Sequence, residues 1–187
     1  GLRPGLWIHY KWGDKPNKSL RKMIHGRFGR PPIYFDEHLT RNAANQMRQY
    51  LFNIGYFDAE TSFEVSKKKK NASVTYIIQP GPPYHISHLQ YTIEDPQLEQ
   101  LILADTADRL LKEGRLFNAY VMDSERDRVI NLLKNNGFYY ISKDFIRFEA
   151  DSNKLDKTVR LNMRLEPPGF RQPGAGESHQ AYFIRNI

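Results

Sequence analysis

The 187-residue chain contains no cysteine. This absence excludes disulfide bonds, thiolate metal sites and a cysteine nucleophile, and it fits an oxidising compartment. No apolar run approaches the roughly 18 residues that a membrane-spanning helix needs. Apolar residues still make up 40% of the chain and charged residues 26%, which is the composition of an ordinary folded protein. The chain is therefore long enough for one domain or two small ones, each with its own core.

Catalytic signatures are missing as well. No HExxH motif, Walker loop, GxSxG motif or dinucleotide fingerprint occurs. The six histidines are dispersed. His85 and His88 lie three residues apart in an expected strand, so their side chains should point to opposite faces. Five carboxylates are assigned to helix beginnings, where they favour the free N–H groups and the helix dipole: Glu94, Asp95, Asp123, Glu125 and Asp127. We therefore expect no catalytic residue, no metal site and no cofactor.

Positive charge is concentrated near the N-terminus. The whole chain carries a net charge of +7, and the excess of Lys and Arg over Asp and Glu falls within residues 1–33. Such a basic block can attract anionic lipid headgroups or nucleic acid, or it can be the solvated face of a helix. The residues assigned to this candidate basic surface are Lys15, Lys18, Arg21, Lys22, Arg27 and Arg30.

The sequence also repeats at a fixed offset. Four features recur 82 residues later: Phe35-Asp36 as Phe117-Asn118, Leu51 as Leu133, Gly55-Tyr56 as Gly137-Phe138, and Phe63 as Phe145. A second similarity links Tyr84-His85-Ile86 with Tyr182-Phe183-Ile184. An internal repeat of this kind indicates copies of one structural unit. The pattern predicts two modules and the first strand of a third.

The second copy shows the order of elements in the module. Residues 85–93 alternate as a strand, and Pro96 stands where a helix can begin. Asn118 is a good N-cap for a second helix that Gly137 should end, and Asp36 and Gly55 hold the same two places in the first copy. Residues 138–148 and 159–165 are expected to be the last two strands. This β-α-α-β-β order predicts an α+β fold with a three-stranded mixed sheet and two helices on one face.

The expected domain boundaries follow from the repeat. Residues 1–84 form the first module, whose first strand is uncertain or missing. Residues 85–169 form the second module. Residues 170–187 are a linker and the first strand of a truncated third module.

One feature favours RNA binding. Residues 26–29 (GRFG) are a GxxG inside the basic block, and KH domains clamp RNA with such a loop. Against this, Pro31-Pro32 follows at once and would break the helix that the loop should precede. The second copy has only Gly114 at the equivalent place. A KH-like RNA-binding module is therefore the alternative, and nucleic acid is not the expected partner.

Several motifs resemble POTRA domains, arranged in tandem. Residues 51–57 (LFNIGYF) and 133–139 (LKNNGFY) are similar to the end of the second helix in that family. Residues 81–86 (GPPYHI) resemble the G-x-x-Y-x-I stretch that joins one module to the next, and residues 176–184 are similar to the following junction. Residues 15–18 (KPNK) and 28–36 (FGRPPIYFD) are similar to the TamA-like lipoprotein branch of the BamA/TamA outer-membrane assembly family.

The resemblance implies a periplasmic arm, tethered to the outer membrane, that precedes a C-terminal membrane β-barrel. Its partners would be unfolded outer-membrane proteins and envelope assembly proteins, with anionic lipid headgroups near the basic surface. In POTRA domains the second strand is an edge to which an extended client can add a strand. The edge residues carried over are Thr61, Ser62, Phe63, Glu64 and Val65 in the first module, and Asp144, Phe145, Ile146, Arg147 and Phe148 in the second.

Two other readings stay open. The same module occurs in secretion and division complexes that have no barrel, and the sequence beyond Ile187 would distinguish the two. The edges can also be purely structural, protected against pairing by charged residues such as Glu64, Lys143, Asp144 and Arg147.

Overall fold

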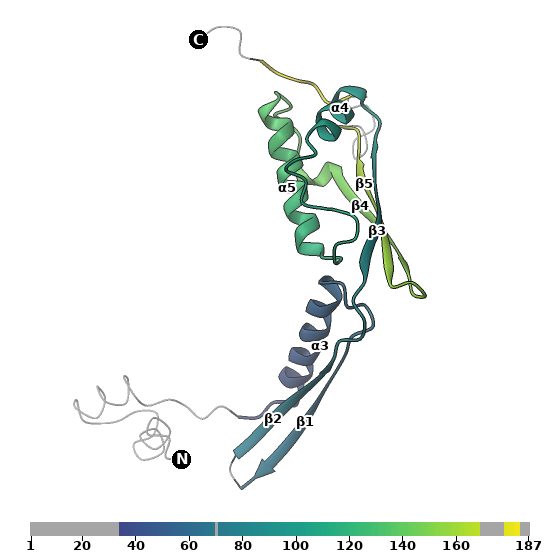
Figure 1. Ribbon diagram of the computed structural model, residues 1–187. Coiled ribbons are helices and arrows are strands. Elements are labelled where there is room, and N and C mark those ends of the chain that lie inside the picture. Colours follow the sequence, from purple (N-terminus) through teal and green to yellow (C-terminus); the bar gives the residue numbers. More distant parts are fainter. Residues whose placement is uncertain (1–33, 70, 169–177, 184–187) are drawn as a thin grey trace, which may run out of the picture.

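The computed structural model describes residues 34–69, 71–168 and 178–183 (Figure 1). Two α+β units follow each other along the chain, and the second unit contains every element of the expected module. The candidate basic surface and the GxxG loop both fall within residues 1–33, outside the described part of the chain. The described residues 34–84 contain neither the first strand nor the first helix of the expected module.

The first module consists, in its described part, of one helix and a long hairpin. Helix α3 (Glu37–Asn53) begins at the predicted N-cap Asp36, whose carboxylate accepts the N–H of Leu39 at 3.1 Å. Strands β1 (Glu60–Lys68) and β2 (Asn71–Gln79) pair antiparallel over their full length. Thr61 Oγ1 donates to the carbonyl of Ala44 at 2.8 Å, which fixes the hairpin on the helix.

The second module confirms the predicted order. It contains β3 (His85–Ile93), α4 (Pro96–Ala104), α5 (Ala119–Asn135), the short 3₁₀ helix η1 (Lys143–Phe145), β4 (Ile146–Asn153) and β5 (Thr158–Leu165). The strand order is β3-β5-β4, with β3 parallel and β4 antiparallel to β5. The predicted caps Asp95 and Asn118 both accept N–H groups from the first turns of their helices.

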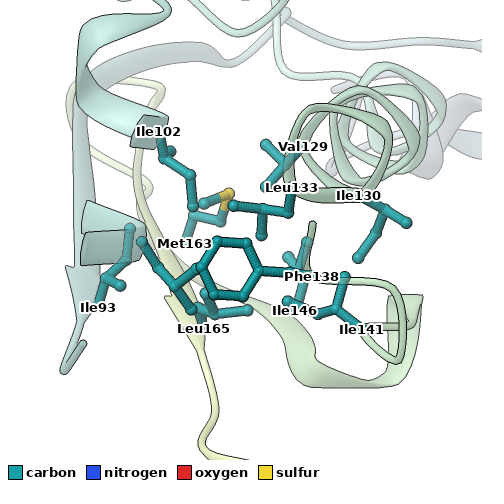
Figure 2. Close-up of a cluster of buried hydrophobic side chains, with 11 residues drawn as sticks. Ile93, Ile102, Val129, Ile130, Leu133, Phe138, Ile141, Ile146, Met163 and Leu165 are labelled. Atoms are coloured by element: carbon teal, nitrogen blue, oxygen red, sulfur yellow. The ribbon is translucent and has the colours of Figure 1, made fainter. Parts of the chain in front are cut away.

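The core of this module lies between the helices and the sheet (Figure 2). Ile102 of α4 and Val129 and Leu133 of α5 point toward Met163 of the central strand β5, and all four side chains are buried. Phe138, just after α5, fills the same space. Burying an aliphatic side chain of this size stabilises the folded state by about 1.5–3 kcal/mol. The cluster therefore holds both helices on one face of the sheet.

The predicted strand over residues 138–148 is wrong in its first part. Phe138 and Ile141 are both buried, but the chain turns between them and then forms η1, so β4 begins only at Ile146. Apolar residues three apart fit a turn better than the period of two in a strand. Asp144 and Phe145 consequently lie in η1 and not in the strand.

This turn also changes the alignment of the two modules. In the first module Thr61 binds Ala44 of α3, and in the second Ile146 accepts a hydrogen bond from Arg126, which lies 82 residues after Ala44. Ile146 is therefore the counterpart of Thr61, and the offset has grown by three residues. The structural counterpart of Phe63 is then Phe148, not Phe145 as the sequence repeat suggested.

Glu125 has a different role from the predicted one. Its side chain is fully buried in α5, where it accepts the N–H of Leu110 at 2.9 Å and two hydrogen bonds from Arg128. Arg128 also pairs with Asp105 at the end of α4. Glu125 thereby holds the irregular segment 105–118 in place. The prediction that Glu125 favours a helix beginning is wrong.

The two modules meet at Gly55, just after α3. Gly55 has a φ of +92°, as predicted for a helix-ending glycine, and its carbonyl accepts the N–H of Tyr84 at 2.8 Å. The carbonyl of Tyr84 in turn accepts the N–H of Phe117 at 2.9 Å. A Cβ on Gly55 would lie only 2.6 Å from the Phe117 carbonyl oxygen. Only glycine allows the second module to approach the first this closely.

Side chains reinforce the junction. The ring of Phe57 packs against those of Tyr84 and Phe117, with centroids 4.7 Å and 5.0 Å away. Tyr84 Oη and Lys157 Nζ both donate to Asp58 Oδ2 at 3.0 Å. These donors, Lys157 first, lower the pKa of the Asp58 carboxyl below its usual 3.8. The contacts of the ionised Asp58 therefore stabilise the junction fully at pH values above 3.8. This stabilisation is lost as the pH falls through the lowered pKa of Asp58.

We expect Glu125→Ala to destabilise the protein by about 3–5 kcal/mol, because it leaves Arg128 without its buried partner and frees the N–H of Leu110. Urea unfolding followed by circular dichroism measures this loss. Asp127→Ala, which removes only an exposed ion pair with Lys143, should cost no more than about 1 kcal/mol. Equal losses for the two variants would contradict the role given to Glu125.

We expect Gly55→Ala to loosen the junction, because the added Cβ meets the Phe117 carbonyl as well as a left-handed backbone. Gly114→Ala is the matched control: Gly114 also has a positive φ, of +78°, but no atom lies within 4 Å of its Cβ position. The control should lose only about 1–2 kcal/mol of stability, which is the cost of placing a residue with a Cβ in a left-handed backbone conformation. Gly55→Ala should lose more unfolding free energy than the control, and NMR relaxation should show that its two modules tumble more independently. Both effects would arise from the close contact at Gly55. Identical behaviour of the two variants would show that the contact is unimportant.

Candidate functional site

The two edges of the second sheet differ. The edge formed by β3 is covered near its start by the segment 113–116: the N–H of Ile86 donates to Arg115 O at 2.8 Å, and the N–H of Gly114 donates to Ile86 O at 2.7 Å. The N–H of Leu89 is bound by the Glu113 carboxylate at 3.0 Å. These contacts occupy backbone groups that a further strand would need.

The edge formed by β4 is open. Within the described residues no strand lies beyond it. The N–H of Glu166 donates to Phe145 O at 2.8 Å, and this bond sets the phase of the antiparallel ladder. Because hydrogen-bonded and non-hydrogen-bonded pairs alternate, Arg147, Glu149 and Asp151 direct their backbone groups to β5. The backbone groups of Phe148, Ala150 and Ser152 point outward, and these three residues are the candidate binding edge.

The start of β4 is closed by α5. Arg126 Nε donates to the carbonyl of Ile146 at 3.1 Å, and its guanidinium lies 5.2 Å from the centroid of the Phe148 ring. Lys143 Nζ, in η1, binds Asp127 at 2.7 Å and Asp123 at 3.5 Å. The hydrogen bond to Asp127 is the main cause that raises the pKa of Lys143. The accessible part of the edge therefore begins at Phe148.

The two faces of β4 differ in character. Ile146 is buried and Phe148 half-buried against the helices. On the other face, the Glu149 carboxylate accepts a hydrogen bond from Asn162 at 3.1 Å and lies 3.5 Å from Arg164 Nε. A strand added to this edge would thus meet an apolar helix-side face and a charged opposite face.

Strand β1 forms the corresponding edge of the first module. Thr61, Phe63 and Val65 are half-buried on the α3 side, whereas Ser62 and Glu64 are exposed. The rings of Phe63 and Tyr76 of β2 lie 6.4 Å apart. β1 pairs with β2 on one side, and no other described strand pairs with it.

Eight of the ten predicted edge residues lie in the strands to which they were assigned. Thr61–Val65 are all in β1, and Ile146, Arg147 and Phe148 are in β4, whereas Asp144 and Phe145 are in η1. Sequence reasoning missed Ala150 and Ser152, the outward positions further along β4. The only sequence signal for them is the polar turn after Asn153, which allows the strand to continue that far.

The prediction for His85 and His88 is wrong. A β-bulge at Ser87 shifts the register, so the two histidines pair with Thr158 and Arg160, which share one face of β5. Both are exposed, and His88 Nδ1 lies 3.1 Å from Glu113. Among the described residues, no group of three or more His, Asp or Glu side chains gathers where a metal could be held. None of the described helices is long and apolar enough to cross a membrane.

We expect amide hydrogen exchange to alternate along β4. The N–H groups of Phe148, Ala150 and Ser152 face away from β5 and should exchange faster than those of Glu149 and Asp151 by roughly an order of magnitude or more. Assigned NMR spectra after transfer to D₂O measure these rates residue by residue. Protection of all five amides to the same degree would mean that the outward side of β4 is already paired.

Comparison with known proteins bears on the first module. Residues 16–81 match a protein family described as POTRA, surface antigen variable number repeat. No curated protein matches the chain.

Three solved structures are similar to this chain over most of its length. POTRA domains 3–5 of Haemophilus influenzae BamA are 16% identical, with a TM-score of 0.44, over 82% of this chain and 62% of that one. Haemophilus ducreyi BamA lacking POTRA domains 1–3 is 14% identical, with a TM-score of 0.43, over 85% and 26%. POTRA domains 1–3 of Anabaena Omp85 are 9% identical, with a TM-score of 0.37, over 85% and 62%. This chain therefore spans less than two thirds of each of those chains.

The family match confirms the coarser part of the resemblance. POTRA-type sequence is present over residues 16–81, and the second module independently has the β-α-α-β-β order with a three-stranded mixed sheet that the resemblance implied.

Proposed function

We propose that this chain is a periplasmic arm of an outer-membrane protein assembly or translocation factor, of the TamA-like branch, and that it is a non-catalytic binding module. It holds extended segments of unfolded outer-membrane proteins or of accessory subunits by adding their backbone to β4. A membrane β-barrel elsewhere in the whole protein receives these clients.

The observation that carries the proposal is the difference between the two edges of the second sheet. Backbone groups of β3 are occupied by the segment 113–116, whereas those of Phe148, Ala150 and Ser152 face outward. An extended peptide that spans the edge from Phe148 to Ser152 can pair with these groups by main-chain hydrogen bonds. Main-chain pairing depends on an extended shape more than on sequence, as a receptor for many clients requires.

The expected affinity is low. Each outward residue offers an N–H and a C=O, and a net hydrogen bond contributes about 0.5–1.5 kcal/mol. Association itself costs at least about 4 kcal/mol in lost translational and rotational freedom. Backbone pairing at three residues therefore leaves only a small surplus, to which contact with the Phe148 ring adds. Weak binding suits a site that must release its client to the barrel.

Strand β1 is a second edge of the same kind. Its inner face is half-buried and its outer face polar, as in β4. A client long enough to reach both modules gains by the high effective concentration at the second edge. The same geometry also serves a secretion or division complex without a barrel, which the sequence downstream of Ile187 distinguishes.

The test uses Ala150→Pro. Proline removes the outward N–H of Ala150 and places its ring in the path of an added strand, but leaves the ladder to β5 intact, because that N–H does not face β5. We expect the variant to stay folded and to bind a peptide from an outer-membrane β-strand roughly tenfold or more weakly, a loss of about 1.4 kcal/mol. NMR titration gives both the affinity and the residues whose resonances shift.

Ala150→Ser is the matched control, because it keeps the backbone N–H and should bind as the unchanged protein does. Unfolding midpoints of both variants verify the fold. Equal affinity of the proline and serine variants, or shifts confined to residues away from β1 and β4, would reject strand addition. A short RNA in place of the peptide should produce no shifts, and salt-dependent RNA binding would support the KH-like alternative instead.

A further inference from the structure

The end of the second module repeats the geometry of the junction between the modules. Gly137 has a φ of +94°, close to the +92° of Gly55. The carbonyl of Gly137 accepts the N–H of Tyr182 at 2.8 Å, as that of Gly55 accepts the N–H of Tyr84 at 2.8 Å. The carbonyl of Tyr182 lies 3.1 Å from the Cβ position of Gly137, and that of Tyr84 lies 3.3 Å from the Cβ position of Gly55. Tyr182 therefore stands where Tyr84 stands in the first junction.

The residues leading to Tyr182 are held on the second module. His179 packs edge-on against Phe145, with ring centroids 4.9 Å apart, and its Nε2 lies 3.0 Å from Glu166 O. Ala181 packs against the core cluster of Figure 2. The position of Tyr182 is thus set by contacts within this chain and not by one hydrogen bond.

The two junctions differ in what covers them. Tyr84 is fully buried, because the second module lies over it. At the second junction four aromatic side chains are exposed, and we name them the aromatic face: Tyr139 at 70%, Tyr140 at 75%, Tyr182 at 54% and Phe183 at 77%. Their rings are already in contact, since Tyr140 lies 5.7 Å from Tyr139 and 5.3 Å from Tyr182. A cluster of exposed aromatic rings on a folded domain indicates an interaction surface.

The first junction shows what such a surface binds. There the following module contributes three groups: the N–H of Phe117, which donates to Tyr84 O; the Phe117 ring, 5.0 Å from that of Phe57; and Lys157, which binds Asp58. By the offset of 82 residues, Tyr139 occupies the place of Phe57 and Tyr140 the place of Asp58.

We propose that the aromatic face is the docking surface of a third module of the same β-α-α-β-β fold, whose first strand continues from Tyr182 and Phe183. The loop before its long helix donates a backbone N–H to Tyr182 O and lays an apolar side chain on Tyr139. A cation in the place of Lys157 lies over the ring of Tyr140, because tyrosine attracts a cation by its ring face where Asp58 does so by its charge.

Continuity with the first junction selects this occupant. The N–H of Tyr182 already makes the hydrogen bond that the N–H of Tyr84 makes just before β3, so a module that continues the chain from Phe183 would start at the aromatic face itself. A client strand bound at β4 or a second copy of the chain would not be led to the face by this connection. The inference does not depend on client binding at the strand edges.

The experiment extends the chain by a copy of its own second module: residues 1–183 followed by residues 86–168, so that Tyr182 and Phe183 replace Tyr84 and His85 of the copy. The copy carries Tyr139→Ser and Tyr140→Ser, so that its peptides are not confused with those of the original aromatic face. Tetranitromethane nitrates accessible tyrosines, and mass spectrometry locates them. In the 187-residue chain, Tyr139 and Tyr140 should react as fast as Tyr34, which is 79% exposed. In the extended chain their nitration should slow several-fold while that of Tyr34 stays unchanged. Unchanged nitration beside a folded third module overturns the proposal.

A second measurement needs no extension. Tyr139→Ser combined with Tyr140→Ser should leave the urea midpoint of the 187-residue chain and its peptide affinity at β4 unchanged. Both side chains are exposed in this chain and would be buried only by a third module. A clear drop in the midpoint would mean that they belong to the core of the second module, which overturns the proposal. Protection from nitration that grows with the concentration of the 187-residue chain would identify a second copy as the occupant and overturn it as well.

Discussion

The arrangement of the two modules depends on one close backbone contact. Helix α3 is followed by Gly55, whose carbonyl accepts the N–H of Tyr84 just before the second module, and no side chain at position 55 would leave room for the Phe117 carbonyl. Because the contact is between main chains, it has a narrow range of distances and directions. The ring of Phe57 and the group formed by Asp58, Tyr84 and Lys157 then resist rotation about it. The helix end and the module junction are thus one structural feature.

This constraint bears on binding because it orients the strand edges of successive modules. A junction of fixed geometry keeps β1 and β4 at a constant separation, which under the proposed strand addition would let a long client engage both edges. The same reasoning explains why the second junction matters, since the Gly137 carbonyl is bonded in the same way as that of Gly55.

Sequence reasoning succeeded where the controlling chemistry is local. The caps Asp36, Asp95 and Asn118 were predicted because a short polar side chain can satisfy free N–H groups of its own helix, whatever lies around it. Gly55 and Gly137 were predicted because a helix end in the left-handed region favours glycine. It failed where distant residues decide. Glu125 resembles any exposed helical carboxylate in sequence, and only the fold brings Leu110 and Arg128 around it.

The sequence by itself determined the internal repeat, the order of strands and helices in the second module and the residues that begin the helices, because these follow from periodicity and local hydrogen bonding. The tertiary structure alone decided which backbone groups at the two edges of the second sheet face outward and which are covered. The bulge at Ser87, the turn at η1 and the loop over β3 each depend on backbone hydrogen bonds between segments far apart in the chain. Shifting a strand by one residue exchanges its inward and outward groups, so the outward positions at Phe148, Ala150 and Ser152 became visible only with the register of β4 on β5.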